Sequence, residues 1–113
     1  MGDNCLFCKI IAGDIAATKL YEDEDLLAFR DINPEAPLHF LVIPKKHIAG
    51  PGFITDPDRE LLGKVLQKGA QLAKESGYES YRFVINNGSE AGQTVFHFHL
   101  HVLGGRPFSW PPG

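Results

Sequence analysis

The order of apolar and polar residues along the chain predicts five short strands and two helices. Runs of apolar and β-branched residues that end at glycine, proline or acidic residues are typical of strands. The strands predicted in this way are Lys19–Glu22, Leu26–Arg30, Leu38–Ile43, Tyr81–Ile85 and Thr94–Leu103. A short helix is expected at Cys5–Ala12, because Gly13 follows it and favours a helix end.

One long helix is predicted to begin near Asp56 and to end at Gly77. Asp56 is a capping residue type, and Pro57 follows it at the first helical position, where a missing N–H is no loss. Apolar residues then recur at helical spacing, as one stripe that would pack on a sheet: Leu61, Leu62, Val65, Leu66, Leu72 and Ala73. The order of elements therefore predicts a single α+β domain over residues 1–113, an antiparallel sheet that carries one long helix.

Composition narrows the class of protein without identifying it. The chain has 113 residues and a net charge of -3, which fits one ordered domain. It has no stripe of basic residues of the kind that binds nucleic acid. No stretch reaches the length of a transmembrane helix, and the N-terminus lacks the pattern of a signal peptide. We therefore expect a cytoplasmic protein with neither a membrane nor a nucleic acid as partner.

The strongest functional signal is the run His97-Phe98-His99-Leu100-His101. In a strand, alternate side chains share a face, so three imidazoles are predicted to line one side, about 6.5–7 Å apart. Burying three such groups without a purpose is costly, because each needs polar partners. Near neutral pH an imidazole can be a nucleophile, an acid, a base or a metal ligand. The triplet therefore predicts a chemical site.

Two weaker signals accompany the triplet. The loop Gly88–Thr94 is rich in small residues, and glycines let backbone N–H groups approach an anion. Gln93 and Thr94 add side-chain donors, so the loop is a candidate phosphate cradle. Asp31 could accept from both hydroxyls of a ribose, and Ile32 could pack on a base. On spacing alone, however, a plain turn aspartate is the better interpretation of Asp31.

The pair Cys5 and Cys8 accounts for both cysteines of the chain. In a reducing compartment this spacing is more typical of a metal or redox pair than of a structural disulfide. Positions i and i+3 of a helix share a face, so the two thiolates could supply half of a tetrahedral zinc site. Two buried cysteines in a helix can also simply belong to the core, and that alternative stays open.

Taken together, these motifs resemble the histidine triad (HIT) family, most strongly its branch of nucleotide-binding phosphoramidases. The resemblance extends from about Cys5 to Gly113, and its motifs are highly specific in combination. The segments that carry it are Asp31-Ile32, HFLVIPKKH at 39–47, GQTV at 92–95, HFHLHVL at 97–103, GGR at 104–106 and WPPG at 110–113.

The resemblance implies a fold, an assembly and a reaction. The fold would be a five-stranded antiparallel sheet with one long and one short helix, and two copies would join their sheets across a homodimer. The reaction would be hydrolysis of purine nucleoside 5′-phosphoramidates, with no cofactor required for catalysis. His99 would attack the α-phosphorus and form a nucleotidyl-histidine, which water then hydrolyses.

The resemblance also implies roles for the surrounding residues. His101 would hold and polarise the phosphate oxygens, His39 would support the nucleophile, and Asp31 would bind the ribose hydroxyls. The residues expected to donate further hydrogen bonds to the phosphate are Asn86, Gly92, Gln93 and Thr94. The residues expected to line the base pocket are Ile32, Leu6, Phe7, Ile10 and Phe29.

The cysteine pair is a departure from the phosphoramidase branch, which often lacks it. Bacterial relatives and the uridylyltransferase branch carry such a pair and bind zinc with it. Carried over residue by residue, the resemblance implies a structural zinc held by Cys5, Cys8, His47 and His97. The zinc site and the catalytic site can coexist only if His97 turns toward the short helix while the other two triplet histidines face the ligand.

Three other functions stay open. The same triplet serves dinucleoside polyphosphate hydrolases, although the ending Trp110–Gly113 argues against them. A nucleotide-binding regulatory partner with vestigial catalysis is a second possibility, although His99, His101 and Asn86 are all intact. The third is a catalytic metal centre, but no carboxylate accompanies the histidines at a helpful spacing.

Overall fold

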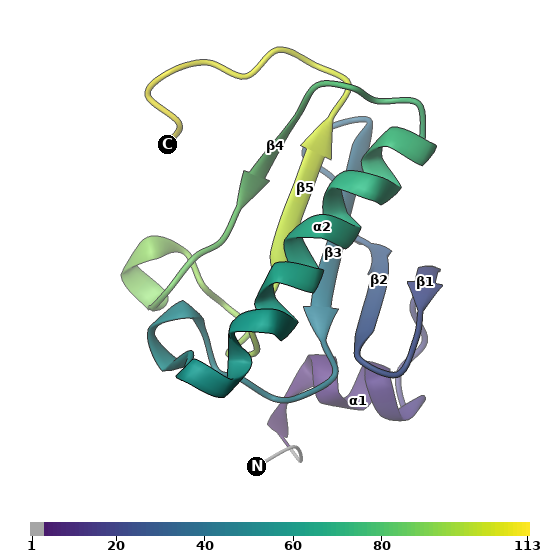
Figure 1. Ribbon diagram of the computed structural model, residues 1–113. Helices are drawn as coiled ribbons and strands as arrows, with labels where there is room; N and C mark the ends of the chain where they lie inside the picture. The colour runs from purple at the N-terminus through teal and green to yellow at the C-terminus, as the bar shows by residue number, and fades with distance from the viewer. Residues whose placement is uncertain (1–3) are drawn as a thin grey trace.

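The computed structural model describes residues 4–113, so the first three residues of the predicted domain 1–113 lie outside the described residues (Figure 1). Its helices and strands are α1 (Leu6–Ala12), β1 (Lys19–Glu22), β2 (Leu26–Arg30), β3 (Leu38–Pro44), α2 (Arg59–Glu75), β4 (Tyr81–Val84) and β5 (Leu100–Gly104). The strands form one antiparallel sheet in the order β1-β2-β3-β5-β4. This confirms the predicted α+β fold, a five-stranded sheet with one long and one short helix.

The central strands β2 and β3 are buried on both faces of the sheet, because α2 packs on one face and α1 packs on part of the other. Residues of β2 alternate between two cores, since successive side chains of a strand point to opposite faces. Leu26 and Ala28 belong to the core under α2, whereas Leu27 and Phe29 belong to the core beside α1. In Figure 1, α2 crosses the near face of the sheet and α1 lies at its lower end. The second core, beside α1, is the one that adjoins the candidate site.

The long helix packs closely on β5. Val65, Leu72 and Ala73 are buried in the interface, as the apolar stripe predicts. Gly69 lies between them, and a Cβ added there would come within 2.8 Å of Leu100 Cδ2. Leu66 is 42% exposed and does not belong to the buried stripe, because one residue along a helix turns the side chain by about 100°. None of the helices in residues 4–113 has the length and apolar character of a membrane span.

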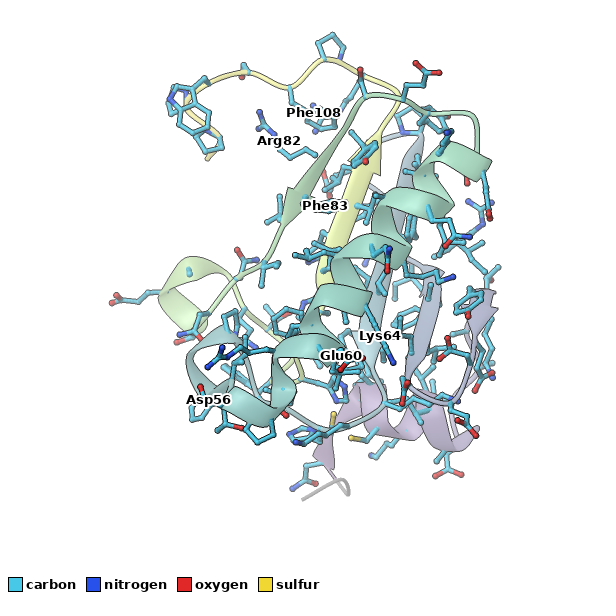
Figure 2. The ribbon with its side chains drawn as sticks, viewed as in Figure 1. Asp56, Glu60, Lys64, Arg82, Phe83 and Phe108 are labelled. Carbon is cyan, nitrogen blue, oxygen red and sulfur yellow. The ribbon has the colours of Figure 1, made fainter. Side chains whose placement is uncertain are left out.

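The start of α2 differs from the prediction. Residues Asp56–Asp58 form a 3₁₀ turn, α2 begins at Arg59, and Asp56 is exposed beside it (Figure 2). The residue that organises the turn is Asp58, whose carboxylate accepts from the Thr55 N–H at 3.0 Å and the Thr55 hydroxyl at 2.9 Å. The Lys46 ammonium, together with those donors, lowers the pKa of Asp58 to about 2. The buried, ionised carboxylate of Asp58 therefore has the capping role that the sequence predicts for Asp56.

The chain that follows β5 turns back toward β4. The Arg82 guanidinium donates to the Ser109 carbonyl at 3.1 Å and lies over the Phe108 ring, 5.2 Å from its centroid (Figure 2). Arg106 stacks on the same ring at 4.4 Å. Trp110 extends beyond these contacts and is 82% exposed. The C-terminal segment is thus anchored near β4 while its end faces solvent.

Candidate active site

The histidine triplet does not lie in one regular strand. Because β5 begins at Leu100, His97 and His99 precede the strand and only His101 belongs to it. The prediction of a strand over Thr94–Leu103 is therefore wrong in its first half.

Hydrogen bonds explain why the strand starts late. The last residue pair between β3 and β5 is Val42 with Leu100. The Phe98 N–H instead donates to the Ile48 carbonyl, at 2.6 Å, in the segment that leaves β3. The His97 carbonyl accepts from the imidazole of His99 at 2.7 Å. The chain therefore turns before β5, and the imidazoles of the triplet separate into two groups rather than lining one face.

His99 is held as a neutral imidazole with one available nitrogen. Its Nδ1 lies 2.7 Å from the His97 carbonyl, which can only accept, so the proton is assigned to Nδ1 and the lone pair to Nε2. Burial lowers the pKa of His99, and the residue is 7% exposed. The Phe7 ring packs edge-on against the imidazole, with centroids 5.0 Å apart. A neutral ring with a free Nε2 has the form that a nucleophile requires.

A chain of hydrogen bonds fixes His101 as a donor. The Glu35 N–H donates to His39 Nδ1 at 3.0 Å, so the proton of His39 lies on Nε2. That Nε2 lies 2.9 Å from His101 Nδ1 and 3.3 Å from Asp31 Oδ2, and the shorter contact has hydrogen-bond geometry. His101 Nδ1 thus accepts, which leaves its proton on Nε2. Burial lowers the pKa of His39, and burial followed by the neighbouring histidines lowers the pKa of His101 to about 4.

A cavity of about 430 Å³ brings most of the predicted residues together. The polar residues that line it include His99, His101, Asn86 and Thr94, and most of its apolar residues come from α1, β2 and β3. The predicted base-pocket residues that line it are Leu6, Phe7, Ile10, Phe29 and Ile32. The sequence analysis missed Arg30, Leu41 and Val95, which also line it. Leu41 pairs with Phe29 across β2 and β3, so a predicted strand register would have found it.

Asp31 is held in a turn and also lines the cavity. One carboxylate oxygen accepts from the Asn33 N–H at 2.8 Å, as in a plain turn aspartate. The other oxygen lies 3.3 Å from His39 Nε2 and 3.9 Å from His101 Nδ1, and the residue lines the cavity. Ile32, beside it, is 90% exposed at the rim. The carboxylate is therefore both a turn residue and part of the cavity wall.

The small-residue loop shapes the cavity in a different way from the one predicted. Gln93 does not line it: its side chain is buried, accepts from the Gly88 N–H at 2.7 Å and donates to the Ala49 carbonyl at 2.7 Å. The Gly92 N–H donates to the Ser89 carbonyl at 3.0 Å. These two predicted phosphate donors are thus engaged inside the loop, which corrects the predicted cradle. Gly92 instead allows the chain to turn, with a φ of +101° that favours glycine.

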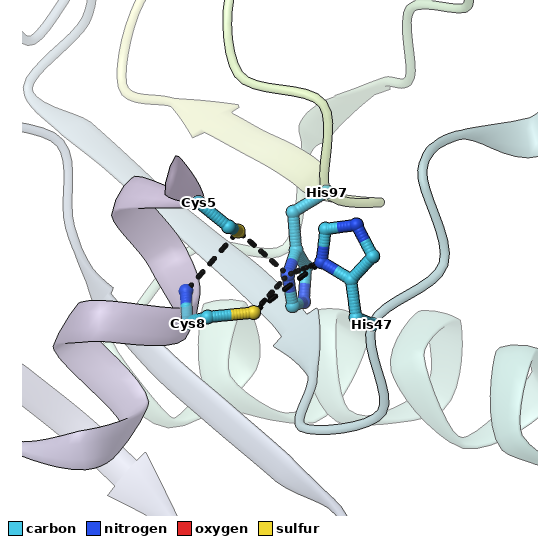
Figure 3. Close-up of side chains that lie close together, drawn as sticks. All are labelled: Cys5, Cys8, His47 and His97. Atoms are coloured by element: carbon cyan, nitrogen blue, oxygen red, sulfur yellow. Dashed lines mark hydrogen bonds between the residues drawn. The ribbon is translucent and has the colours of Figure 1, made fainter. Parts of the chain in front are cut away.

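His97 belongs to a second cluster, formed with the cysteine pair and His47 (Figure 3). His97 Nδ1 lies 3.3 Å from Cys5 Sγ, 3.5 Å from Cys8 Sγ and 3.2 Å from His47 Nδ1. Cys8 Sγ also lies 3.3 Å from His47 Nδ1. These residues come from α1, from the segment after β3 and from the segment before β5. The structure therefore turns His97 toward α1, as the coexistence of two sites requires.

The geometry of this second cluster fits a tetrahedral metal ion. Around a zinc, two nitrogens would lie about 3.3 Å apart, and a nitrogen and a sulfur about 3.6 Å apart. The observed separations match these values. His97 Nε2 lies 2.7 Å from the Pro44 carbonyl, so its proton is on Nε2 and Nδ1 is free to ligate. Cys5 is the N-cap of α1 rather than part of the predicted helix Cys5–Ala12, and its sulfur accepts from the Cys8 N–H at 3.2 Å.

Comparisons with known proteins found a matching family model and similar sequences and structures. The family model described as "Scavenger mRNA decapping enzyme C-term binding" matches residues 4–108. A HIT-like protein of Synechocystis sp. is 53% identical over 114 residues, which cover 100% of both chains. A HIT family hydrolase from Legionella pneumophila is 54% identical, with a TM-score of 0.94, over 97% of this chain and 100% of that chain. A histidine triad protein from Clostridium difficile is 41% identical, with a TM-score of 0.90, over 95% of each chain.

Proposed function

Because the chain belongs to the histidine triad (HIT) family, we propose that it is a hydrolase of purine nucleoside 5′-phosphoramidates, such as adenosine 5′-phosphoramidate. The products are the nucleoside monophosphate and an amine. The observation that carries the proposal is the neutral imidazole of His99 in the cavity wall, with its proton fixed on Nδ1. Two related solved structures bear the name HIT family hydrolase, which supports the reaction class.

The reaction proceeds in two displacements at phosphorus. His99 Nε2 attacks the α-phosphorus, the P–N bond breaks, and the departing nitrogen takes up a proton. The nucleotidyl-histidine then reacts with water, which forms a P–O bond and releases the monophosphate and the free imidazole. Splitting one difficult displacement into two easier ones is the advantage of a covalent intermediate.

Polar side chains that line the cavity supply the hydrogen-bond donors for the phosphate. His101 donates from Nε2, because its Nδ1 accepts from His39. Asn86 and Thr94 line the same cavity and carry an amide and a hydroxyl. Such donors accelerate the reaction when they meet the charge that develops on the phosphate oxygens. Asp31 binds the ribose hydroxyls, and the aromatic and aliphatic residues of α1, β2 and β3 enclose the base.

The charge of the cavity favours a phosphoramidate over a dinucleoside polyphosphate. Arg30 is the one Lys or Arg among the described residues that line it. A polyphosphate bridge carries several negative charges and is usually bound by several cationic side chains or a metal. A single α-phosphate needs only the neutral donors named above. A side-by-side comparison of adenosine 5′-phosphoramidate and diadenosine polyphosphate, at equal concentration, tests this preference through kcat/KM.

The experiment that tests the proposed function combines turnover with binding. Wild-type protein releases AMP from adenosine 5′-phosphoramidate, whereas His99→Ala does not, although AMP still binds to both with similar Kd. Lys74→Ala, on the exposed side of α2, is the control variant. Gln93→Glu is not a suitable control, because the Gln93 side chain accepts from the Gly88 N–H and the substitution disturbs the loop. Retention of the wild-type kcat by His99→Ala would refute the role of the nucleophile. Absence of turnover in the wild-type protein, with intact AMP binding, would favour a binding protein.

The second cluster is proposed to hold a structural zinc through Cys5, Cys8, His47 and His97. The donor set of two thiolates and two imidazoles is typical of such sites, and the Pro44 carbonyl orients one of the imidazoles. The ion supplies a tie between α1 and the sheet, and no step of the hydrolysis passes through it. Elemental analysis of protein purified without chelator is expected to give about one zinc per chain.

The assembly is proposed to be a homodimer joined through β4. This strand lies at the edge of the sheet, where its outer backbone groups are open to pairing. Tyr81 and Ile85, in β4 and directly after it, are 36% and 37% exposed. Light scattering is expected to give twice the 12.5 kDa of one chain, and a monomer mass would contradict the proposal.

A further inference from the structure

A second cavity, of about 380 Å³, adjoins the nucleotide cavity. The residues that line it are Asn4, Cys5, Leu6, His47 and the segment Thr94–Phe96, so two of the proposed zinc ligands, Cys5 and His47, belong to its wall. Leu6, Thr94 and Val95 line both cavities, so the two meet across these three residues. The mechanism proposed above places no part of the nucleotide in this second cavity.

The position of the second cavity relates it to the group that leaves phosphorus. In an in-line displacement, the departing atom lies on the opposite side of phosphorus from the attacking atom. His99 is buried in the cavity wall, whereas Thr94, which lines the same cavity, is exposed. A group that departs away from His99 therefore moves outward, toward the exposed polar rim. Thr94 is the residue of that rim at which the second cavity begins.

The chemistry of the walls indicates what the second cavity binds. Phe96 is 49% exposed and Leu6 is 43% exposed, so two large apolar side chains present surface there. Among the described residues that line it, none is Lys, Arg, Asp or Glu. Asn4 and Thr94 add neutral polar groups. Such walls favour an aromatic or branched aliphatic group and provide nothing to compensate a phosphate or carboxylate charge.

We propose that the second cavity binds the amine side of the phosphoramidate and selects substrates whose amine carries an aromatic or branched aliphatic group. This inference rests on the proposed function and names its substrate class. When the P–N bond breaks, its electron pair goes to the amine nitrogen, which takes up a proton. The neutral or protonated amine then leaves through the open side of this cavity.

The test compares substrates and variants together. The substrates are adenosine 5′-phosphoramidates with no substituent on nitrogen, with tryptamine and with glutamate. Wild-type kcat/KM is expected to be highest for the tryptamine compound. Phe96→Ala is expected to lower kcat/KM for it about tenfold, the scale of a lost apolar contact, and to leave the unsubstituted compound unchanged. Phe53→Ala, which removes an exposed phenyl ring outside both cavities, is the matched control.

A second variant separates loss of contact from loss of folding. Phe96→Asp places a carboxylate in the wall and is expected to shift the preference toward an amine that carries a cation, such as a lysine derivative. A misfolded protein cannot show such a gain. Equal kcat/KM ratios among the amines in wild type and Phe96→Ala, or a preference of wild type for glutamate, would overturn the inference while the proposed function stands. Absence of turnover with every amine would overturn the proposed function itself, and the inference with it.

Discussion

Two clusters of histidines adjoin each other at His97, and they differ in which imidazole nitrogen is hydrogen-bonded to a backbone carbonyl. In the cysteine-containing cluster, the Pro44 carbonyl accepts a hydrogen bond from Nε2–H of His97, so Nδ1 faces the two thiols. In the other cluster, which contains His99, His101 and His39 and is proposed to be catalytic, the His97 carbonyl accepts a hydrogen bond from Nδ1–H of His99, so Nε2 is free. The same residue type thus presents Nδ1 to the thiols in one cluster and a free Nε2 in the other, because the carbonyl acceptor lies on opposite sides of the ring.

His97 links the two clusters through different atoms. Its imidazole belongs to the cysteine-containing cluster, and its carbonyl orients the nucleophile. Phe7, between the two cysteines in sequence, contacts the His99 ring. The helix that carries Phe7 has only 7 residues, which is too short for a helix to be stable by itself. Whatever holds that helix on the sheet therefore also holds one wall of the catalytic cavity.

The largest effect is expected when the catalytic cluster loses its nucleophile. His99→Ala removes the atom that forms the bond to phosphorus, so kcat should fall by about 10⁴-fold or more. The equivalent change in the other cluster, His47→Ala, should leave kcat within about tenfold at saturating nucleotide. Steady-state kinetics on the two variants measures this contrast. Equal losses in both would show that the clusters do not have separate roles.

A smaller loss is expected from the residues that hold the phosphate and fix its donor. His101→Ala removes a donor to the transition state and should lower kcat by about 10²–10³-fold, with little change in KM. His39→Gln replaces the imidazole with a flexible amide that can still donate to His101 Nδ1, so it should cost less than removal of His101 itself. If His39→Gln were the more damaging of the two, His39 would contact the substrate directly and the assigned relay would be wrong.

Removal of the metal should affect stability more than chemistry. Cys8→Ser, or treatment with a chelator, is expected to abolish zinc binding and to lower the Tm by about 10 °C, the scale of roughly 2 kcal/mol in a domain of this size. Nucleotide affinity should weaken because α1 forms part of the base pocket, while kcat at saturation changes little. Calorimetry on zinc-loaded and chelated protein measures both the Tm and the affinity for nucleotide. An unchanged Tm, with zinc verified as absent, would remove the structural role.

The smallest effect is expected from acid. His101 has a pKa of about 4 in the folded protein, below the ordinary value of 6.5, because burial disfavours its charged form. Between these two values the unfolded chain binds more protons, so the free energy of unfolding should fall as pH is lowered from 6.5 to 4. His101→Phe should flatten that part of the profile. Urea titrations of both proteins at several pH values measure the slope, and equal slopes would place the acid sensitivity elsewhere.

The sequence was sufficient for the fold because its local signals agree with one another. The apolar stripe of α2 and the apolar run of β2 each predict an element that the structure contains. The late start of β5 was not predictable in the same way. It depends on the contact of Phe98 with Ile48, which are far apart in sequence, and no local pattern encodes it.

The candidate site was predictable in its residue types and less so in its hydrogen bonds. Cys5, Cys8 and His47 meet His97 as the resemblance implies. Gln93 was assigned to the phosphate because an amide next to a glycine-rich loop has the right chemistry for it. Its partners are the Gly88 N–H and the Ala49 carbonyl, and a sequence does not show which acceptors a folded loop will present.

If His99 is the nucleophile, its Nε2 becomes covalently bonded to phosphorus during turnover, and intact-mass spectrometry detects that bond. Wild-type protein and His99→Ala are mixed with adenosine 5′-phosphoramidate and quenched in mid-turnover, and the stereochemistry at phosphorus is followed with a chiral substrate. The account predicts a nucleotidyl adduct on His99 in the wild type, none in the variant, and overall retention of configuration from two successive inversions. Turnover with net inversion, or an adduct on a different residue, would contradict it.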